Sequence, residues 1–412
     1  MVKLNIDLRK WWTISLVLYI ICSTAFSYGD LRMLNTYALY FFFGVSIVNI
    51  IQKKSIKFNT AAASVIFYMV LLLIGMLYTP TAENKVEAVM YDYITMAVLM
   101  FCVVQYIDTV RDVNVIMFSY MLAGLALAIY VYTQYGAEFW TKMQEATEYS
   151  SGHIDRLGSE LANANTIGMT TGISALIALY YILFDRKCKL RTVICIPITV
   201  FCFVVSMAAA SKKGVLVLAI ALVCFWFYNA LGDPDSLKQF RNLLILAGSI
   251  AVLLWMITTL PIFSAISARF EELFKMLQGG TGGESEVSRS EFIVKGLSVW
   301  LDNPLFGAGT AASIYHLGVY SHNNFVEILM NSGIVGFVVF YGVYPVAGYL
   351  YLKNALNYKM LSKLPILLFA LLISITVCSV GMVYYYSRYF MTLFAVTFSA
   401  VNVFGKKELM GV

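Results

Sequence analysis

Long apolar blocks, separated by short polar connections, recur along most of the chain. Most blocks hold about 18–25 residues, the length that a helix needs to cross a hydrocarbon core about 30 Å thick. The pattern predicts an all-α, polytopic integral membrane protein with about 12 transmembrane helices, and we expect residues 1–412 to form a single integral membrane domain. The predicted spans are residues 11–28, 33–52, 60–78, 86–107, 113–135, 163–184, 190–210, 213–230, 241–260, 324–352, 363–382 and 388–405.

The amino-acid composition supports a membrane protein. Hydrophobic residues make up 60% of the sequence and charged residues 13%, a balance that excludes soluble globular, disordered and fibrous proteins. The formal net charge of +6 would favour a nucleic-acid partner in a soluble protein. In a membrane protein the position of the basic residues sets the topology instead, so we expect contact with a lipid bilayer and none with nucleic acid.

Basic residues cluster at three places, 53–57, 186–191 and 406–407. Short segments rich in lysine and arginine stay in the cytoplasm, which places both termini on the cytoplasmic side. Two longer segments then lie outside, residues 136–162 and 261–323. The second is long enough to fold over a site, and we expect it to form a large helical extracytoplasmic loop between spans 9 and 10.

The sequence predicts two helices within this loop. Apolar residues at helical spacing in 262–278 predict an amphipathic helix at the membrane interface. A second helix is predicted to begin at Ser288, where Ser288 and Glu291 would form a capping box, and to end near Asp302. In that register Arg289 lies in the first turn of the helix.

Basic residues on the outer side are the first candidates for binding an anion. Arg289 would lie beside free backbone N–H groups at the positive end of a helix, an arrangement that suits a phosphate. Lys212 and Lys213 occupy a short outer turn at 208–216. The alternative for each is a side chain that faces solvent or reaches the lipid headgroups.

His322 is the candidate base. It stands at the start of a span and is followed by Asn323, Glu327 and Asn331, which are four residues apart. This spacing places the three polar side chains on one helix face that enters the membrane. An ionisable Glu327 inside a span is costly unless it faces a wet cavity or a partner, so the stripe predicts the lining of a site. The alternative is a histidine that only caps the helix at the interface.

Motifs of several other chemistries are missing from the sequence. It has no HExxH, no CxxC pair, no Walker lysine loop and no GxGxxG after a strand. Zinc hydrolysis, nucleotide hydrolysis and dinucleotide chemistry therefore lack their usual residues. We expect chemistry at the membrane surface with neither a metal nor a cofactor.

Four segments of the outer connections and the adjoining spans carry a further signal. In chain order they are RLGSELANANTIG (156–168), SKKGVL (211–216), RSEFIVKGLSVWLDNPLFGAGT (289–310) and HNNFVEILMNSGIVGF (322–337). Together they resemble the O-antigen polymerase and O-antigen ligase superfamily, the Wzy and WaaL proteins of bacterial envelope polysaccharide assembly. Two positions depart from the family pattern, since Ala164 replaces the usual proline and Lys212 stands where arginine is usual.

The resemblance implies a GT-C-like, inverting glycosyltransferase that takes a saccharide from undecaprenyl diphosphate without a metal. His322 matches the proposed general base of the family, and Arg289 and Lys212 match positions that contact the diphosphate. Lys213 is a further candidate for this contact because it adjoins Lys212. The predicted site residues are catalytic His322, diphosphate-binding Arg289, Lys212, Lys213 and Arg156, and cavity-lining Asn165, Asn323, Glu327 and Asn331.

The function expected from the resemblance is that of a polymerase. It would extend O-antigen, capsule or exopolysaccharide on its lipid carrier at the outer face of the bacterial plasma membrane. Its partners would be an undecaprenyl-diphosphate-linked oligosaccharide, an acceptor saccharide and a chain-length regulator. Two alternatives stay open: an O-antigen ligase, which transfers the finished polymer to a lipid or protein acceptor, and a flippase that moves the lipid-linked oligosaccharide without transferring it.

Overall fold

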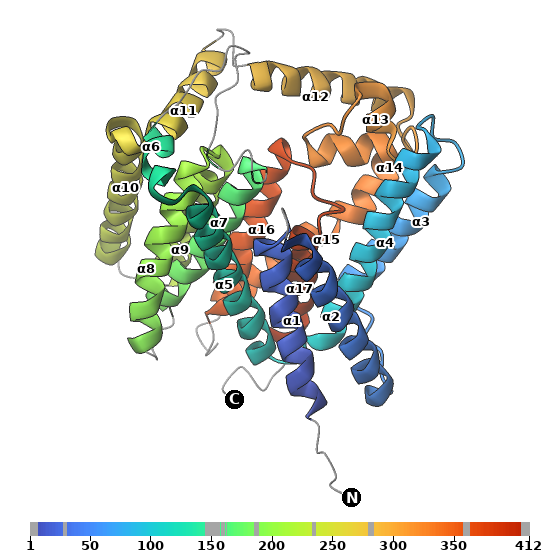
Figure 1. Ribbon diagram of the computed structural model, residues 1–412, viewed down its shortest axis with the longest axis horizontal. Coiled ribbons are helices and arrows are strands. Elements are labelled where there is room, and N and C mark those ends of the chain that lie inside the picture. Colours follow the sequence, from blue (N-terminus) through green and yellow to red (C-terminus); the bar gives the residue numbers. More distant parts are fainter. Residues whose placement is uncertain are drawn as a thin grey trace, which may run out of the picture.

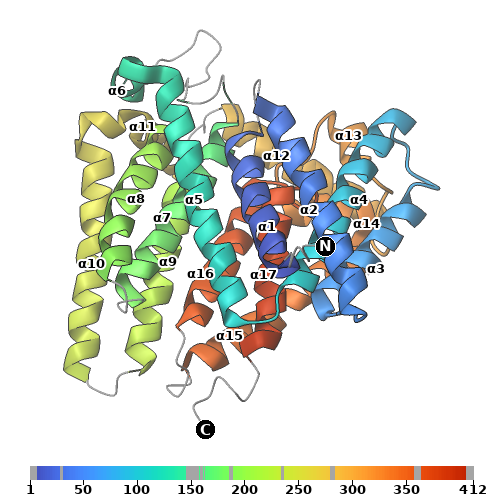
Figure 2. The same cartoon turned by 60° about the horizontal axis from the view of Figure 1, so that its bottom comes forward.

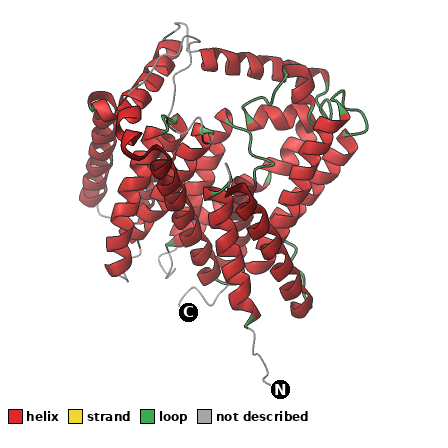
Figure 3. Cartoon of the chain, viewed as in Figure 1, coloured by secondary structure: helices red, strands yellow, loops and turns green. Residues whose placement is uncertain are grey.

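The chain folds into a bundle of helices. The computed structural model describes residues 7–27, 31–144, 157, 161, 163–184, 189–232, 236–278, 284–356 and 363–404. Within these ranges helices are joined by turns and loops, and no strand occurs (Figure 3). The all-α class predicted from the sequence is therefore confirmed.

The longer helices follow the predicted apolar blocks closely, and shorter ones lie in the connections. The α-helices are α1 (Leu8–Ala25), α2 (Arg32–Lys53), α3 (Thr60–Gly75), α4 (Glu83–Tyr106), α5 (Val110–Tyr135), α6 (Phe139–Gln144), α7 (Ala164–Phe184), α8 (Lys189–Ala208), α9 (Lys212–Gly232), α10 (Ser236–Thr259), α11 (Ser264–Leu277), α12 (Glu284–Asp302), α13 (Ala312–Leu317), α14 (Asn324–Tyr341), α15 (Val343–Leu356), α16 (Leu364–Cys378) and α17 (Arg388–Phe404). Short 3₁₀ helices precede α6 and α11 and follow α16, at Gly136–Glu138, Pro261–Phe263 and Ser379–Gly381.

The length and composition of these helices identify a polytopic membrane protein. In the part of the chain that the structure describes, eight helices are long and apolar enough to cross a membrane. Helices α3 and α17 are apolar but shorter. The predicted total of about 12 spans stays a prediction.

Two groups of helices lie on either side of α1, α16 and α17. Helices α5 and α7 to α10 form one group, and α2 to α4 with α13 and α14 form the other (Figures 1 and 2). Contacts between α1 and α5, between α9 and α16, and between α4 and α17 join the groups to the centre.

A cluster of charged side chains fixes the lower end of the bundle in Figure 1. Asp108, between α4 and α5, accepts hydrogen bonds from Lys53 at 2.6 Å and from Lys57. Asp112 pairs with Arg9 at 2.6 Å and completes the capping box of α5. The start of α1, the end of α2 and the turn between α4 and α5 therefore meet in one ion-pair network.

The last described helix ends on this same side. The Asn59 side chain, at the start of α3, donates a hydrogen bond to Ser399 Oγ at 2.8 Å, close to the end of α17. The start of α1 and the end of α17 thus lie at one end of the bundle, as the predicted topology requires of them. Whether this end faces the cytoplasm stays a prediction.

Helices α11 and α12 lie across the opposite end of the bundle (Figure 1). Helix α11 confirms the amphipathic helix predicted at 262–278, and it buries Ile266 fully while Phe274 is exposed. Helix α12 ends at Asp302 as predicted, but it begins at Glu284.

The capping box predicted at Ser288 is therefore wrong. Ser288 lies inside α12, and Arg289 lies in the second turn of the helix and not the first. The sequence ESEV at 284–287 supplies acidic residues to the first turn, where the helix dipole stabilises negative charge, and this favours the earlier start. The local Ser-x-x-Glu pattern alone does not contain that information.

Helix α14 is broken at Gly333, and the preceding loop fills the break. Gly333 has φ +61° and ψ −163°, a conformation almost restricted to glycine. The carbonyl of Pro304 accepts a hydrogen bond from the N–H of Ile334 at 2.9 Å, and the N–H of Ala308 donates to the carbonyl of Met330 at 2.7 Å. The backbone N–H and carbonyl groups that lose their helical partners at the break thus form hydrogen bonds with residues 303–310.

The glycines of this segment are needed because backbones approach closely. A Cβ atom on Gly307 would lie 2.6 Å from the Met330 carbonyl oxygen, and one on Gly333 would lie 2.3 Å from the Leu305 carbonyl oxygen. The loop is also tied to the end of α3 and the turn after it, since the N–H of Thr310 donates to the carbonyl of Gly75 at 3.3 Å and Thr79 Oγ1 donates to the carbonyl of Thr310 at 2.7 Å. The loop therefore holds the first half of α14, and the residues before it, in a fixed position.

Candidate active site

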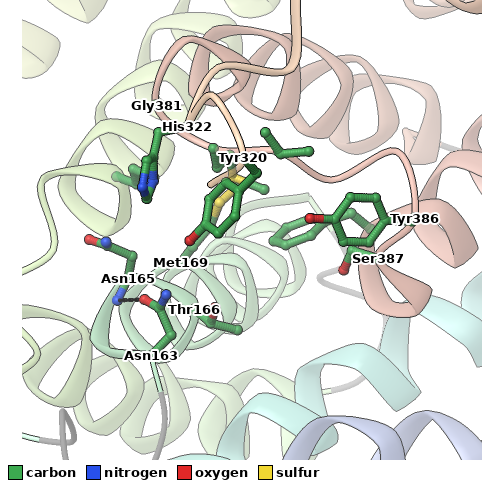
Figure 4. A pocket seen from close by; sticks show the side chains of 13 residues that line it. Asn163, Asn165, Thr166, Met169, Tyr320, His322, Gly381, Tyr386 and Ser387 are labelled. Carbon is green, nitrogen blue, oxygen red and sulfur yellow. Dashed lines mark hydrogen bonds between the residues drawn. The ribbon is translucent and has the colours of Figure 1, made fainter. Parts of the chain in front are cut away.

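A cavity of about 260 Å³ opens where the ends of four segments meet. These segments are the start of α7, the start of α9, the residues before α14 and the turn between α16 and α17 (Figure 4). Its lining is polar on one side and aromatic on the other. The lining residues are Asn163, Asn165, Thr166, Met169, Lys213, Tyr320, His322, Gly381, Met382, Val383, Tyr386, Ser387 and Phe390.

Small residues bring the starts of α7 and α9 together at this cavity. A Cβ atom on Gly168 would lie 2.4 Å from Cβ of Ser211, and one on Gly214 would lie 2.7 Å from the Gly168 carbonyl oxygen. Larger side chains at these two glycines would separate the helices. Close packing of the two helices therefore places two positive helix ends beside one cavity.

The first turn of α7 is capped by an asparagine. Asn163 Oδ1 accepts a hydrogen bond from the N–H of Asn165 at 2.9 Å, and the Asn163 carbonyl accepts one from the N–H of Thr166 at 2.8 Å (Figure 4). Asn165, a predicted cavity residue, does line the cavity. Lys213, in the first turn of α9, adds a positive charge to it. The arrangement suits an anion such as a diphosphate.

His322 lies between aromatic rings immediately before α14. Its ring is stacked on Phe292 of α12, with 6.1 Å between centroids, and it contacts the Tyr320 ring at 4.2 Å. The backbone of His322 has φ +57°, which is uncommon for a residue other than glycine. Such strained residues often occur at functional sites, where the surrounding structure fixes them.

The surroundings of His322 keep its imidazole neutral. Burial, together with the positive charges of Arg289 and Lys213, lowers the pKa of His322 from 6.5 to about 4. At pH 7 the ring therefore carries no charge and has one nitrogen that can accept a proton. Lys213 and His322 line the same cavity, and the charge of Arg289 acts on the imidazole from α12.

The Asn323, Glu327 and Asn331 stripe does not line this cavity. Glu327 is 2% exposed, and its carboxylate accepts hydrogen bonds from Ser313 Oγ at 2.6 Å and from the N–H of Ser321 at 2.7 Å. Asn331 is also buried and lies 3.5 Å from the same carboxylate. The polar partner of Glu327 is thus the turn next to His322 and not a water-filled space.

Asn323 has a structural role in the same turn. Its side chain caps α14 by accepting hydrogen bonds from the N–H groups of Phe325 at 3.0 Å and Val326 at 3.2 Å. Glu327 and Asn323 together hold the backbone on both sides of His322. Asn323 and Glu327 therefore contact the backbone next to His322 and do not form the cavity wall.

Two further predicted residues, Lys212 and Arg289, do not line the cavity. Lys212 is not among the lining residues, although its neighbour Lys213 is. Arg289, on α12, is half-buried and lies outside the lining, but its charge acts on His322 and Tyr320. Arg156 lies outside the residues that the structure describes.

Sequence reasoning missed the aromatic and hydroxyl side of the cavity. Tyr386 and Ser387 come from the turn between α16 and α17, and Tyr320 comes from the loop before His322 (Figure 4). Burial raises the pKa of Tyr320, so its hydroxyl is a neutral donor or acceptor at pH 7. The run YYYSR at 384–388 is the one signal that pointed to this turn, since it is a polar interruption between two spans.

The fold and the site together define a class of protein. It is a polytopic helical membrane protein in which a neutral histidine, cationic side chains and two helix starts surround one small polar cavity at one end of the bundle. Residues 197–341 match the family described as O-antigen ligase, which confirms the resemblance to the O-antigen polymerase and ligase superfamily. The matched segment includes Lys213, Arg289 and His322. No curated protein matches the chain.

Proposed function

We propose that the protein transfers a saccharide from undecaprenyl diphosphate to a hydroxyl group of an acceptor sugar. The observation that carries the proposal is the neutral imidazole of His322, held next to the positive charges of Lys213 and Arg289. Glycosyl transfer from a diphosphate needs both a base for the acceptor proton and positive charge for the departing anion. The family match supports an enzyme of envelope polysaccharide processing.

In the proposed reaction the acceptor hydroxyl oxygen forms a bond to C1 of the donor sugar. The bond between C1 and the diphosphate oxygen breaks, and its electron pair leaves with the diphosphate. The hydroxyl proton passes to the unprotonated nitrogen of His322. Lys213 and the starts of α7 and α9 stabilise the charge that develops on the diphosphate. Attack from the side opposite the leaving group would invert the configuration at C1.

A low pKa makes His322 a weak base before the donor binds, and the bound donor would make it a stronger one. A diphosphate between Lys213, Arg289 and His322 brings negative charge that offsets the two cations. The pKa of His322 should therefore rise when the donor binds. The base would then be neutral before binding and a stronger proton acceptor in the complex, as catalysis near neutral pH requires.

Glu327 acts in this proposal as a positioning residue. Its carboxylate joins Ser313 of α13 to the N–H of Ser321, one residue before His322. A shift of about 1 Å in a catalytic group can cost about 100-fold in rate. The buried carboxylate thus contributes through the geometry of His322, without contact with the substrate.

We place the reaction at the outer face of the bacterial plasma membrane. The cavity and α12 lie at the end of the bundle opposite the basic cluster of Arg9, Lys53 and Lys57. Because basic connections favour the cytoplasm, this end would face outward. Lipid-linked donors that have crossed the membrane would reach the cavity from there.

Polymerase is the first candidate activity, with the growing glycan or the next repeat unit as acceptor. The second candidate is a ligase that transfers the finished polymer to a lipid or protein, and the description of the matched family favours it. The two activities share the donor, the base and the anion site. They differ in the acceptor and in the length of the product.

The test is transfer by the purified protein in lipid nanodiscs, with the cell's own undecaprenyl-diphosphate repeat unit as the only saccharide. The proposal expects release of undecaprenyl diphosphate and products that contain two or more repeat units. Transfer that occurs only after a non-saccharide acceptor is added would favour the ligase. No release of undecaprenyl diphosphate under either condition would contradict the proposal.

A further inference from the structure

A second cavity of about 580 Å³ lies beside the first, between α1, α2, α4 and the start of α7. Three residues, Thr166, Tyr386 and Ser387, line both cavities. The two spaces are therefore neighbours separated by these shared side chains. The larger cavity is within the range of about 300–1,000 Å³ typical of small-molecule sites, whereas the first falls just below it.

The lining of the second cavity combines charged and aromatic side chains. Asp92 and Arg388 face each other at 3.6 Å, and Arg32 adds a second guanidinium. Tyr91 and Tyr40 supply aromatic rings. Carboxylate and guanidinium groups bind hydroxyl groups as acceptors and donors, and flat rings cover the apolar faces of a sugar ring.

One buried polar atom in this lining has no partner. Asn35 Oδ1 is buried and accepts no hydrogen bond from the residues that the structure describes. A buried acceptor without a donor is costly, and such groups are rare unless a ligand or water satisfies them. Asn35 itself is half-buried and lines the cavity, so rotation of its side-chain amide would present this acceptor to a bound molecule that carries donors.

We propose that this second cavity binds the acceptor saccharide, an inference that rests on the proposed transfer reaction. The cations and His322 place the donor diphosphate on the Lys213 side of the first cavity. The acceptor hydroxyl must approach C1 from the side away from the leaving group. Thr166, Tyr386 and Ser387 line both cavities, so an acceptor held in the second cavity would reach the first past these three side chains.

The positions of these side chains also indicate how the acceptor sugar would reach His322 and the donor sugar. Tyr320 lies between His322 and Tyr386 in the view of Figure 4. A saccharide in the second cavity that extends past Tyr386 and Ser387 would bring its terminal hydroxyl into the first cavity, where His322 accepts the proton. The reacting sugar would therefore occupy the small cavity and the following sugars the large one.

The kinetic test compares Asn35→Ala and Tyr91→Ala with the wild type in nanodiscs. The acceptor is an oligosaccharide of one to three repeat units, released by mild acid from the cell's own lipid-linked glycan. Loss of one hydrogen bond or one ring contact should raise the KM for this acceptor about fivefold, while the KM for the lipid-linked donor changes by less than about twofold. An unchanged donor KM also shows that each variant is folded.

The matched control is Tyr37→Ala. Tyr37 is an exposed tyrosine of α2 that lines neither cavity, so its loss should leave both KM values unchanged. A rise in the donor KM with no change in the acceptor KM would assign the second cavity to the donor glycan and overturn the proposal. Unchanged values for both substrates in both variants would overturn it as well.

Direct binding separates this inference from the proposed reaction. Saturation-transfer NMR with the same oligosaccharide, in the absence of donor, should detect binding to the wild type that is about fivefold weaker in Tyr91→Ala. If the wild type transfers nothing but binds the oligosaccharide in this way, the proposed reaction fails and the saccharide site stands. Equal binding by the wild type and by Tyr91→Ala would refute the saccharide site.

Discussion

The low pKa of His322 makes a specific prediction for the pH dependence of transfer. Burial first, and then Arg289 and Lys213, lower this pKa from 6.5 to about 4. At pH 6 the imidazole is then about 1% protonated, whereas an ordinary histidine would be about three-quarters protonated. Since the base must be neutral, kcat/KM should stay flat from pH 8 to about pH 5 and fall only below that.

Replacing Lys213 by methionine should move this acid limb upward. A positive charge at close range is worth about 1 kcal/mol where water screens it, as at this open cavity, and this corresponds to about 0.7 of a pH unit. The midpoint in Lys213→Met should therefore rise to about pH 5, because burial and Arg289 still lower the pKa. The variant should also be slower at every pH, since Lys213 is proposed to bind the diphosphate.

The assay measures transfer at subsaturating donor over pH 3.5–8 at constant ionic strength, with short incubations because sugar diphosphates hydrolyse in acid. A free-enzyme value comes independently from NMR titration of ¹³C-labelled histidine, assigned with a His322→Ala variant. The control is Lys275→Met, which removes an exposed lysine of α11 outside the cavity and should leave the midpoint unchanged.

Two results would refute this reasoning. A wild-type midpoint near pH 6.5 would mean that neither burial nor the cations act on the catalytic base. A midpoint that is the same in Lys213→Met and in the wild type would remove Lys213 from the electrostatics of His322. The profile of kcat, which reports the donor complex, should lie at higher pH than that of kcat/KM because the bound diphosphate offsets the cations.

Three further predictions concern Glu327, Gly333 and the orientation of the chain. Glu327→Gln keeps an acceptor for the Ser321 N–H and should retain at least about a tenth of the activity, whereas Glu327→Ala should lose about 100-fold; equal rates would contradict the positioning role. Gly333→Ala should lower the free energy of unfolding in detergent by more than about 2 kcal/mol. Gly44→Ala is the control and should leave it unchanged, because a Cβ atom there meets no atom within 4 Å. Equal melting temperatures of the two variants would contradict the strained break. A membrane-impermeant maleimide added to intact spheroplasts should label Tyr315→Cys and miss Ile56→Cys, both at exposed positions, and the reverse pattern would invert the proposed orientation.

The helices could be predicted from the sequence because burial in lipid leaves a continuous apolar signal. The predicted block 388–405 corresponds to α17 (Arg388–Phe404), and the block 60–78 contains α3 (Thr60–Gly75). The break in α14 could not be predicted in this way. It depends on the carbonyls and N–H groups of the 303–308 loop, which pair with α14 only in the folded chain.

The base and the cations of the site carried a local sequence signal, and their surroundings did not. His322 at a helix start and the lysines of the outer turn are visible in the sequence. The sequence marks Glu327 as an unusual carboxylate, but its partners Ser313 of α13 and Ser321 come from a segment whose fold the pattern does not specify. The cavity wall at Tyr386 depends on the packing of α16 and α17, which no spacing within one segment encodes.

The central claim is that His322 accepts the proton of the acceptor hydroxyl. The most direct measurement compares the transfer rates of His322→Ala and His316→Ala with the wild type, using purified protein and lipid-diphosphate donor. His316, on α13, lines neither cavity and serves as the matched control. Loss of a general base costs about 10²–10⁴-fold, so His322→Ala should bind donor normally and transfer at least about 100 times more slowly, while His316→Ala stays close to the wild type. Turnover by His322→Ala within about threefold of the wild type would contradict the claim, because it lies far outside that range.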